Sequence, residues 1–167
     1  MAKVKAAIMA DHLRVWPYLL LSFLVLVADQ TSKFVVLVTF HPHEMIPVLP
    51  VFNLTLVFNE GAAFSFLSHA GGWQRWFFIG LTSVISLGLL VWLTRLKRGE
   101  HYTAVALSMI LGGALGNLLD RVRLGKVVDF LDFYWQGWHW PAFNLADSAI
   151  TLGVVLMLYA TLRQTDN

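Results

Sequence analysis

The sequence predicts an all-α polytopic membrane protein with four transmembrane helices, and two observations lead to that prediction. Hydrophobic residues make up 57% of the 167 residues, and charged residues make up only 13%, about half the share found in soluble domains. The apolar residues also gather into blocks long enough to cross a bilayer, which takes roughly 20 residues of helix. A soluble domain is therefore excluded, and residues 1–167 are expected to form a single membrane domain.

Four apolar blocks are expected to be the membrane spans. At about 1.5 Å per residue, each block covers about the 30 Å thickness of a hydrocarbon core. The first continues through a polar interruption that contains Asp29 and Lys33, and the third contains Gly112, Gly113 and Gly116. Such small residues let membrane helices approach closely. The spans are expected at about 15–40, 73–93, 102–119 and 142–162.

The orientation follows from basic residues near the helix ends, which favour the cytoplasmic side. Arg95, Lys97 and Arg98 form a compact basic group between the second and third spans. With this loop inside, both termini are cytoplasmic, and the connections 41–72 and 122–141 lie on the other side of the membrane.

The two outer connections differ in pattern. Residues 52–59 alternate apolar and mostly polar side chains, which is typical of a strand, and Glu60-Gly61 offers a turn before residues 62–67. A small β-hairpin is therefore expected there. Residues 124–140 are dense in aromatic side chains, as expected at headgroup depth, so this connection is expected to lie along the membrane surface.

Polar residues share one face of each of the last two spans. An ionisable side chain inside a membrane span is costly and is a functional candidate by default. On the fourth span the residues spaced along one helical face are Asn144, Asp147, Ser148 and Thr151. On the third span they are Gly113, Asn117, Asp120 and Arg121. Both faces are expected to point into the protein, where Asp29 and Lys33 pair with each other or with Arg121.

Asp129 and Asp147 are expected to meet near the outer membrane surface. Asp147 lies six residues past Pro141, roughly 9 Å below the start of its span, and Asp129 lies in the connection over the same end. Two neighbouring carboxylates do not readily ionise together, so one keeps a proton while the other stays basic. This asymmetry suits hydrolysis of an amide by water, without a metal or a nucleophilic side chain.

Several alternatives stay open at this point. Asp132 could supply the outer carboxylate, and Asp129 could be a helix N-cap in a surface segment. Asp29 with Lys33, and Asp120 with Arg121, could be structural charge pairs. A carrier, a channel or a structural subunit would also use inward polar groups, although the acidic residues here group at the outer end. The 12 Lys and Arg residues form no basic stripe, so nucleic acid is not an expected partner.

Five segments of the sequence, in order, resemble the lipoprotein signal peptidase family, signal peptidase II. They are Asp29–Lys33, Asn59–Ser65, Gly112–Arg121, Val127–Phe130 and Phe143–Ser148. The resemblance covers the chain from about Leu13 to Arg163. It implies an aspartic endopeptidase of the bacterial inner membrane that removes the signal peptide from diacylglyceryl-modified prolipoproteins. The cut falls just before the lipid-modified cysteine, and the reaction uses no cofactor and no metal.

The same resemblance implies roles for individual residues. It implies that Asp129 and Asp147 are the catalytic pair. The supporting or substrate-binding residues that it implies are Asp29, Lys33, Asn59, Gly61, Asn117, Asp120, Arg121 and Asn144. It further implies a periplasmic β-cradle and a short amphipathic surface helix in the outer connections. The expected partners are the modified prolipoprotein and membrane lipid, and the chain is expected to act as a monomer.

Three of these residues have expected physical roles. Asn144, one helical turn before Asp147, is expected to donate an amide hydrogen bond to that carboxylate. Arg121 is expected to balance the charge of Asp120 or Asp29. Gly61 is expected to leave room for an extended peptide beside the hairpin.

Overall fold

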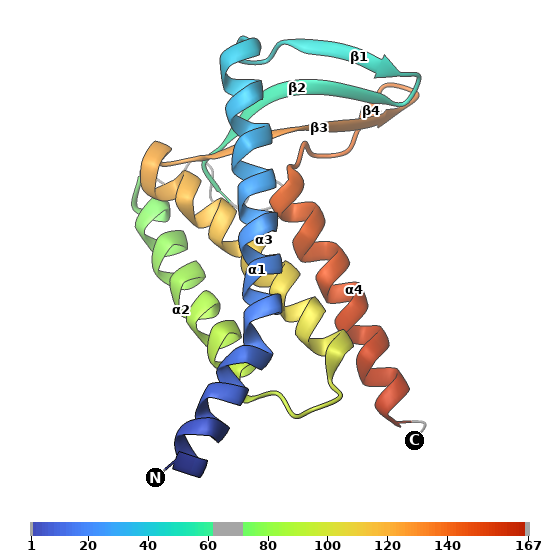
Figure 1. Ribbon diagram of the computed structural model, residues 1–167. Coiled ribbons are helices and arrows are strands. Elements are labelled where there is room, and N and C mark those ends of the chain that lie inside the picture. Colours follow the sequence, from blue (N-terminus) through green and yellow to red (C-terminus); the bar gives the residue numbers. More distant parts are fainter. Residues whose placement is uncertain (1, 62–71, 166–167) are drawn as a thin grey trace.

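The computed structural model describes residues 2–61 and 72–165, and within them four long helices carry a small sheet at one end (Figure 1). The helices are α1 (Ala2–Thr39), α2 (Trp73–Arg95), α3 (His101–Leu124) and α4 (Leu145–Thr165). The strands are β1 (Met45–Leu49), β2 (Phe52–Asn59), β3 (Val127–Trp135) and β4 (Trp138–His139). They form an antiparallel sheet in the order β1-β2-β3-β4.

The four helices of the described chain are long and apolar enough to cross a membrane, which confirms the predicted fold class. Large apolar side chains cover their outer faces; Trp76, Val84 and Leu162 are each about 70% exposed, as expected of surfaces that face lipid. α3 extends further at both ends than the apolar block alone indicated. α4 begins at Leu145, later than the expected position near residue 142.

α3 is the central helix, and it packs against α1, α2 and α4. Glycines make these contacts close. A Cβ atom added at Gly112 would overlap the backbone oxygen of Ser22 on α1, and one at Gly113 would overlap the backbone oxygen of Ala146 on α4. The small residues noted in the sequence therefore bring the polar face of α3 against both neighbours.

The sheet lies at one end of the helix bundle, and both termini lie at the other (Figure 1). β2 confirms the strand predicted at residues 52–59, and it forms a hairpin with the strand that precedes it. The turn is at Pro50-Val51, and the partner strand is β1. Residues 62–67, where the second strand was expected, lie outside the described residues.

The second outer connection also differs from expectation, because its residues 127–135 form strand β3 between β2 and β4. Its β-branched and aromatic residues favour a strand. Asp129 is therefore a strand residue, opposite Val57, and not the N-cap of a helix. The described residues contain no short surface helix beside the four long ones.

A hydrophobic cluster fixes the sheet to the end of α1. Val36 of α1 packs with Leu56 of β2 and with Val128 and Phe130 of β3, all of them buried. The register between β2 and β3 shifts between Leu54 and Val57. Such a bulge places one extra residue in one strand of the pair. The extra residue lies in β2, whereas Val128 and Asp129 are consecutive in β3 and point to opposite faces of the sheet, Val128 into the core and Asp129 beside Asn59.

Candidate active site

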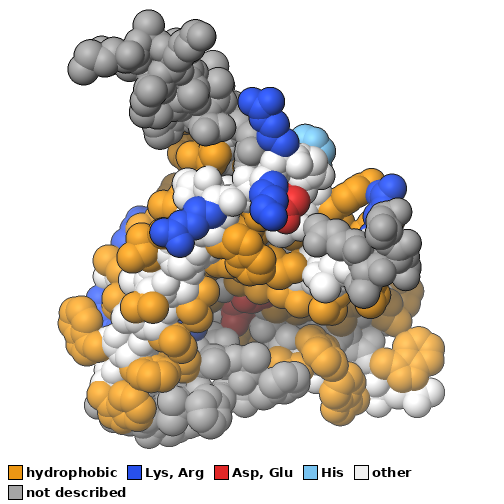
Figure 2. Space-filling model, turned by 90° about the horizontal axis from the view of Figure 1, so that it is seen from below, with side chains coloured by type: hydrophobic (Ala, Val, Ile, Leu, Met, Phe, Trp, Pro, Cys, Tyr) orange, Lys and Arg blue, Asp and Glu red, His pale blue; other side chains and the backbone are white. Residues whose placement is uncertain are grey.

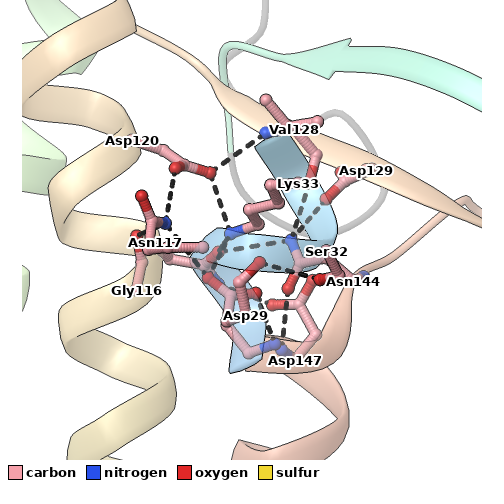
Figure 3. Close-up of polar contacts among 12 residues, drawn as sticks. Asp29, Ser32, Lys33, Gly116, Asn117, Asp120, Val128, Asp129, Asn144 and Asp147 are labelled. Carbon is pink, nitrogen blue, oxygen red and sulfur yellow. Dashed lines mark hydrogen bonds and ion pairs between the residues drawn. The ribbon is translucent and has the colours of Figure 1, made fainter. Parts of the chain in front are cut away.

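Asn144 holds both predicted catalytic carboxylates. Its side-chain Nδ2 donates a hydrogen bond to Asp129 Oδ1 at 2.7 Å, and its backbone N–H donates to Asp147 Oδ2 at 3.3 Å. Asn144 is completely buried and Asp129 is 2% exposed, whereas Asp147 is half-buried in the first turn of α4. Figure 3 shows the two aspartates on either side of this asparagine. The two carboxylates therefore bind the same residue, one through its side chain and the other through its backbone.

The N-terminus of α4 explains this arrangement. Asn144 directly precedes the helix, and its Oδ1 accepts the backbone N–H of Asp147 at 2.9 Å. Together with the bond from Asn144 N–H to Asp147, this is a reciprocal capping box. This corrects two expectations. The side-chain amide of Asn144 donates to Asp129 and not to Asp147. Asp147 lies in the first turn of α4, because Asn144 caps the helix and α4 therefore begins at Leu145, later than expected.

Asn117 on α3 reaches Asp147 from the opposite side. Its Nδ2 donates to Asp147 Oδ1 at 2.8 Å. Its Oδ1 accepts hydrogen bonds from Lys33 Nζ at 2.9 Å and from Asn144 Nδ2 at 3.2 Å. Because two donors meet the amide oxygen, the amide nitrogen must face the carboxylate.

Lys33 is a buried cation of the site. Its Nζ lies 2.8 Å from Asp29 Oδ2 and 2.8 Å from Asp120 Oδ2, and the three side chains are at most 4% exposed. The predicted Asp29–Lys33 pair is confirmed. Within the described residues Lys33, and not Arg121, makes the direct contacts to both carboxylates, although the charge of Asp120 still acts on Arg121. Gln30, which the sequence reasoning did not select, donates to Asp120 Oδ1 at 2.8 Å.

Asp29 also joins α1 to the start of α4. Its Oδ1 accepts the backbone N–H of Ala146 at 2.9 Å. That N–H is one of the first four of the helix, which have no partner inside the helix itself. The first turn of α4 is thus held by two residues: Asn144, which directly precedes it in the sequence, and Asp29, which belongs to α1. These hydrogen bonds fix the position of Asp147 in that turn.

Arg121 binds backbone oxygens. Its Nη2 donates to the carbonyl of Gly61 at 2.8 Å, its Nη1 donates to the carbonyl of Asn117 at 3.3 Å, and the guanidinium lies over the ring of Phe78. Arg121 therefore connects α3 to Gly61, which follows strand β2. The expectation that Gly61 leaves room for a peptide stays a prediction.

Asp129 has a second donor, and its environment alters its acidity. Asn59 Nδ2 donates to Asp129 Oδ2 at 3.1 Å. Burial, followed by the charge of Asp147, raises the pKa of Asp129 to about 7, although the hydrogen bonds from Asn59 and Asn144 and the charge of Lys33 act in the opposite direction. The carboxyl group of Asp129 therefore gains or loses its proton near neutral pH.

A cavity of about 790 Å³ opens beside the two aspartates. Asn59, Asp129, Arg121 and Asp147 line its polar side, and Pro141, Phe143 and Leu152 are among its apolar residues. Ser148 and Thr151 line it too; the helical polar stripe had indicated both, but they were not selected as site residues. In the described chain, no group of three His, Asp or Glu side chains could hold a metal ion.

Asp132, the alternative carboxylate, belongs to a different cluster. It accepts a hydrogen bond from Asn53 Nδ2 at 2.7 Å and lies 2.9 Å from His139 Nδ1. Asp129 and Asp132 are three residues apart on one strand, so they point to opposite faces of the sheet. Asp132 does not line the cavity.

Comparison with known proteins agrees with this geometry. Residues 21–163 match the family described as "Signal peptidase (SPase) II". The lipoprotein signal peptidase of Ectopseudomonas mendocina is 57% identical over 143 residues, which cover 84% of this chain and 85% of that protein. The lipoprotein signal peptidase of Pseudomonas aeruginosa is 52% identical over 143 residues, with the same coverage, 84% and 85%.

Similarity in three dimensions extends over the same region. A solved structure described as a bacterial membrane enzyme is 35% identical, has a TM-score of 0.81 and covers 89% of each chain. The family match contains every site residue from Asp29 to Asp147. The chain therefore belongs to the lipoprotein signal peptidase family, signal peptidase II, and is an aspartic peptidase of bacterial membranes.

Proposed function

We propose that Asp129 and Asp147 are the catalytic pair of this peptidase. The observation that carries the proposal is Asn144, whose side chain binds one carboxylate and whose backbone binds the other. Both aspartates also line the large cavity. Asp129, with a pKa of about 7, is the member that keeps the proton, and Asp147 is the base.

The reaction needs only water as nucleophile. Asp147 takes a proton from a water molecule, whose oxygen attacks the scissile carbonyl carbon while Asp129 gives its proton to the carbonyl oxygen. When the tetrahedral intermediate collapses, Asp129 recovers that proton and Asp147 delivers its own to the leaving amine. The carbon–nitrogen bond breaks, and the pair returns to its starting state.

The substrate is a prolipoprotein that carries diacylglycerol on a cysteine, and the cut falls just before that cysteine. The names of the relatives support a prolipoprotein substrate. The cavity joins the polar pair to apolar residues such as Leu152, which is 59% exposed on the outer face of α4. An acyl chain in the membrane would hold the adjacent peptide bond at the depth of the aspartates, a proximity effect.

The protein lies in the bacterial inner membrane with both termini in the cytoplasm and the sheet on the periplasmic side. Arg95, Lys97 and Arg98 support this orientation, because the loop after α2 lies at the end opposite the sheet and basic loops favour the cytoplasm. The chain acts as a monomer, since α1, β2, α3, β3 and α4 of one chain supply all the residues of the site.

Incubation of the purified full chain with a diacylglyceryl-modified precursor, followed by mass measurement of the fragments, tests the catalytic assignment. Asp129→Asn and Asp147→Asn are nearly isosteric, so both variants should fold and lose at least about 10³-fold in kcat. Asp132→Asn is the matched control and should keep most activity. Full turnover by either catalytic variant contradicts the pair, and complete loss in Asp132→Asn means that Asp132 is the outer carboxylate.

A further inference from the structure

Another cavity, of about 360 Å³, lies at the end of the bundle opposite the sheet. It lies where α1, the end of α2 and the start of α3 meet. Leu93, Leu96 and Ala104, which belong to a buried hydrophobic cluster, form its floor. Lys97, Arg98 and His101 stand around it. The peptidase reaction uses none of these residues, and the cavity is remote from both aspartates.

The cavity is basic at its rim. Lys97 and Arg98 are both exposed, and neither forms an ion pair with another described residue. Glu100 also lines the cavity, but its carboxylate accepts the backbone N–H of Lys97 and thus holds the loop. Figure 2 views this end of the molecule and shows Lys and Arg side chains gathered around hydrophobic ones.

His101 adds a further polar group. The hydroxyl of Tyr18 on α1 contacts His101 Nδ1 at 2.7 Å, which turns the other ring nitrogen away from Tyr18. This contact also joins α1 to the first turn of α3 across the cavity. The rim can therefore offer an ammonium, a guanidinium and an imidazole to the same anion, a set that suits phosphate oxygens.

The depth of the cavity identifies the kind of ligand. α2 ends at Arg95 and α3 begins at His101, so the loop lies where two spans leave the hydrocarbon region. Just before it, Trp92 is 47% exposed on α2, and tryptophan is enriched at the membrane interface. A site with an apolar floor and a cationic rim at this depth matches a phospholipid, with its phosphate at the rim and its glycerol and first acyl carbons below.

We propose that this cavity binds one anionic phospholipid, with the phosphate between Lys97 and Arg98 and the glycerol end against Leu93 and Leu96. A free phosphate would leave the apolar floor uncovered. A zwitterionic lipid would bring a cation of its own toward two basic side chains. The bound lipid would join α1, α2 and α3 at the end of the bundle that the sheet does not hold.

Retention of lipid by the purified full chain tests the proposal. The chain is titrated in detergent micelles with phosphatidylglycerol or with phosphatidylcholine, and retained lipid is counted by native mass spectrometry. The wild type should retain one phosphatidylglycerol, and its Tm should rise with that lipid because the ligand binds the folded state. Arg98→Gln, and Lys97→Gln combined with Arg98→Gln, should lower retention at least about fivefold.

Arg95→Gln is the matched control, because Arg95 lies on the same helix end but does not line the cavity. It removes the same charge and should leave retention unchanged, and Arg98→Lys should restore most of it. Equal loss in Arg95→Gln and Arg98→Gln would show general surface attraction and overturn the proposal. So would equal retention of phosphatidylcholine, or displacement of the lipid by inorganic phosphate at comparable affinity, which would indicate a free-phosphate site.

Discussion

The carboxyl group of Asp129 changes protonation in the middle of the physiological range, because burial and the neighbouring Asp147 raise its pKa to about 7. Asn59 and Asn144 donate hydrogen bonds that favour its charged form. The acidity of this residue is thus set by opposing contacts, and single substitutions should move it in predictable directions.

The pH profile of kcat/KM tests that statement. Activity should fall as the pH rises through about 7, because the shared proton is then lost. Asn59→Ala removes a donor to the charged carboxylate, so the falling limb should move to higher pH, while Asp132→Asn should leave it in place. An unchanged limb in Asn59→Ala, or a shift to lower pH, would contradict the assignment of the proton to Asp129.

Stability should follow the same pKa. The folded pKa of Asp129 exceeds the ordinary value of 3.8, so between about pH 4 and 7 the folded state binds more protons than the unfolded state. The stability contributed by this group therefore falls as the pH rises through that window. Asp129→Asn should remove this contribution. In thermal unfolding, the Tm of the variant should therefore rise relative to the Tm of the wild type as the pH increases from 4 to 7. A constant difference would refute the expectation.

Lys33 should matter more for stability than a surface lysine. Lys33→Met leaves Asp29 and Asp120 buried without a cation, and breaking a buried pair in this way costs about 3–5 kcal/mol. Adding Asp120→Asn to Lys33→Met removes one of the unpaired charges and should recover part of the loss. Thermal unfolding in detergent measures both effects. Wild-type stability of Lys33→Met would mean that the pair contributes little.

At the scale of the element, the start of α4 combines a helix cap with a catalytic position. Asn144 caps the helix and holds Asp129, while Asp147 closes the capping box. The same hydrogen bonds thus begin the helix and orient the carboxylates. A substitution that removes the hydrogen bond to Asp129 but keeps the helix cap should therefore lower activity more than it lowers stability.

Asn144→Ser and Asn144→Ala provide that separation. Serine keeps an oxygen for the Asp147 N–H but cannot reach Asp129 with an amide, whereas alanine lacks both groups. Both variants should lose activity, and Asn144→Ala should be less stable than Asn144→Ser by about 1 kcal/mol. Paired measurements of cleavage and Tm decide the matter, and equal stability of the two would argue against the cap.

Activity and stability should also depend on the close approach of α3 and α4. Gly113→Ala would push a Cβ against the Ala146 backbone oxygen, next to Asp147, at a cost of about 1–3 kcal/mol. Cleavage should weaken together with Tm, because the first turn of α4 is displaced. Gly88→Ala on α2 meets nothing within 4 Å and should be neutral or slightly stabilising. Equal effects of the two substitutions would contradict the argument.

At the scale of the whole molecule, the two ends of the bundle have different chemistry. The sheet, the aspartates and the large cavity lie at one end, and the basic loop and both termini lie at the other. The chain contains no cysteine, so single cysteines can report which end faces which compartment.

Labelling with a membrane-impermeant maleimide tests the proposed orientation. Gln136→Cys, in the exposed turn between β3 and β4, should be labelled from the periplasm of intact cells. Arg95→Cys, at the exposed end of α2, should be labelled only after the inner membrane is opened. The reverse pattern would mean that the chain is inserted the other way.

The sequence by itself determined the four apolar helices, strand β2 and the inward polar faces of α3 and α4. These features depend on local composition and on spacing along one helix or strand, which the order of residues contains directly. The grouping of Asp129 with Asp147 could also be proposed, because both residues are placed at the outer end of the bundle, and the five matching segments then implied that they are the catalytic pair.

Only the tertiary structure decided which polar groups meet. Lys33 rather than Arg121 contacts Asp29 and Asp120, and the side-chain amide of Asn144 donates to Asp129 while its backbone N–H donates to Asp147. The hairpin turn lies at Pro50-Val51, and strand β3 occupies the connection where a short surface helix was expected. These outcomes depend on how closely glycines let helices approach and on which strands pair in the sheet. Both depend on contacts between segments that are distant in the sequence, and the spacing of residues within one segment does not show such contacts.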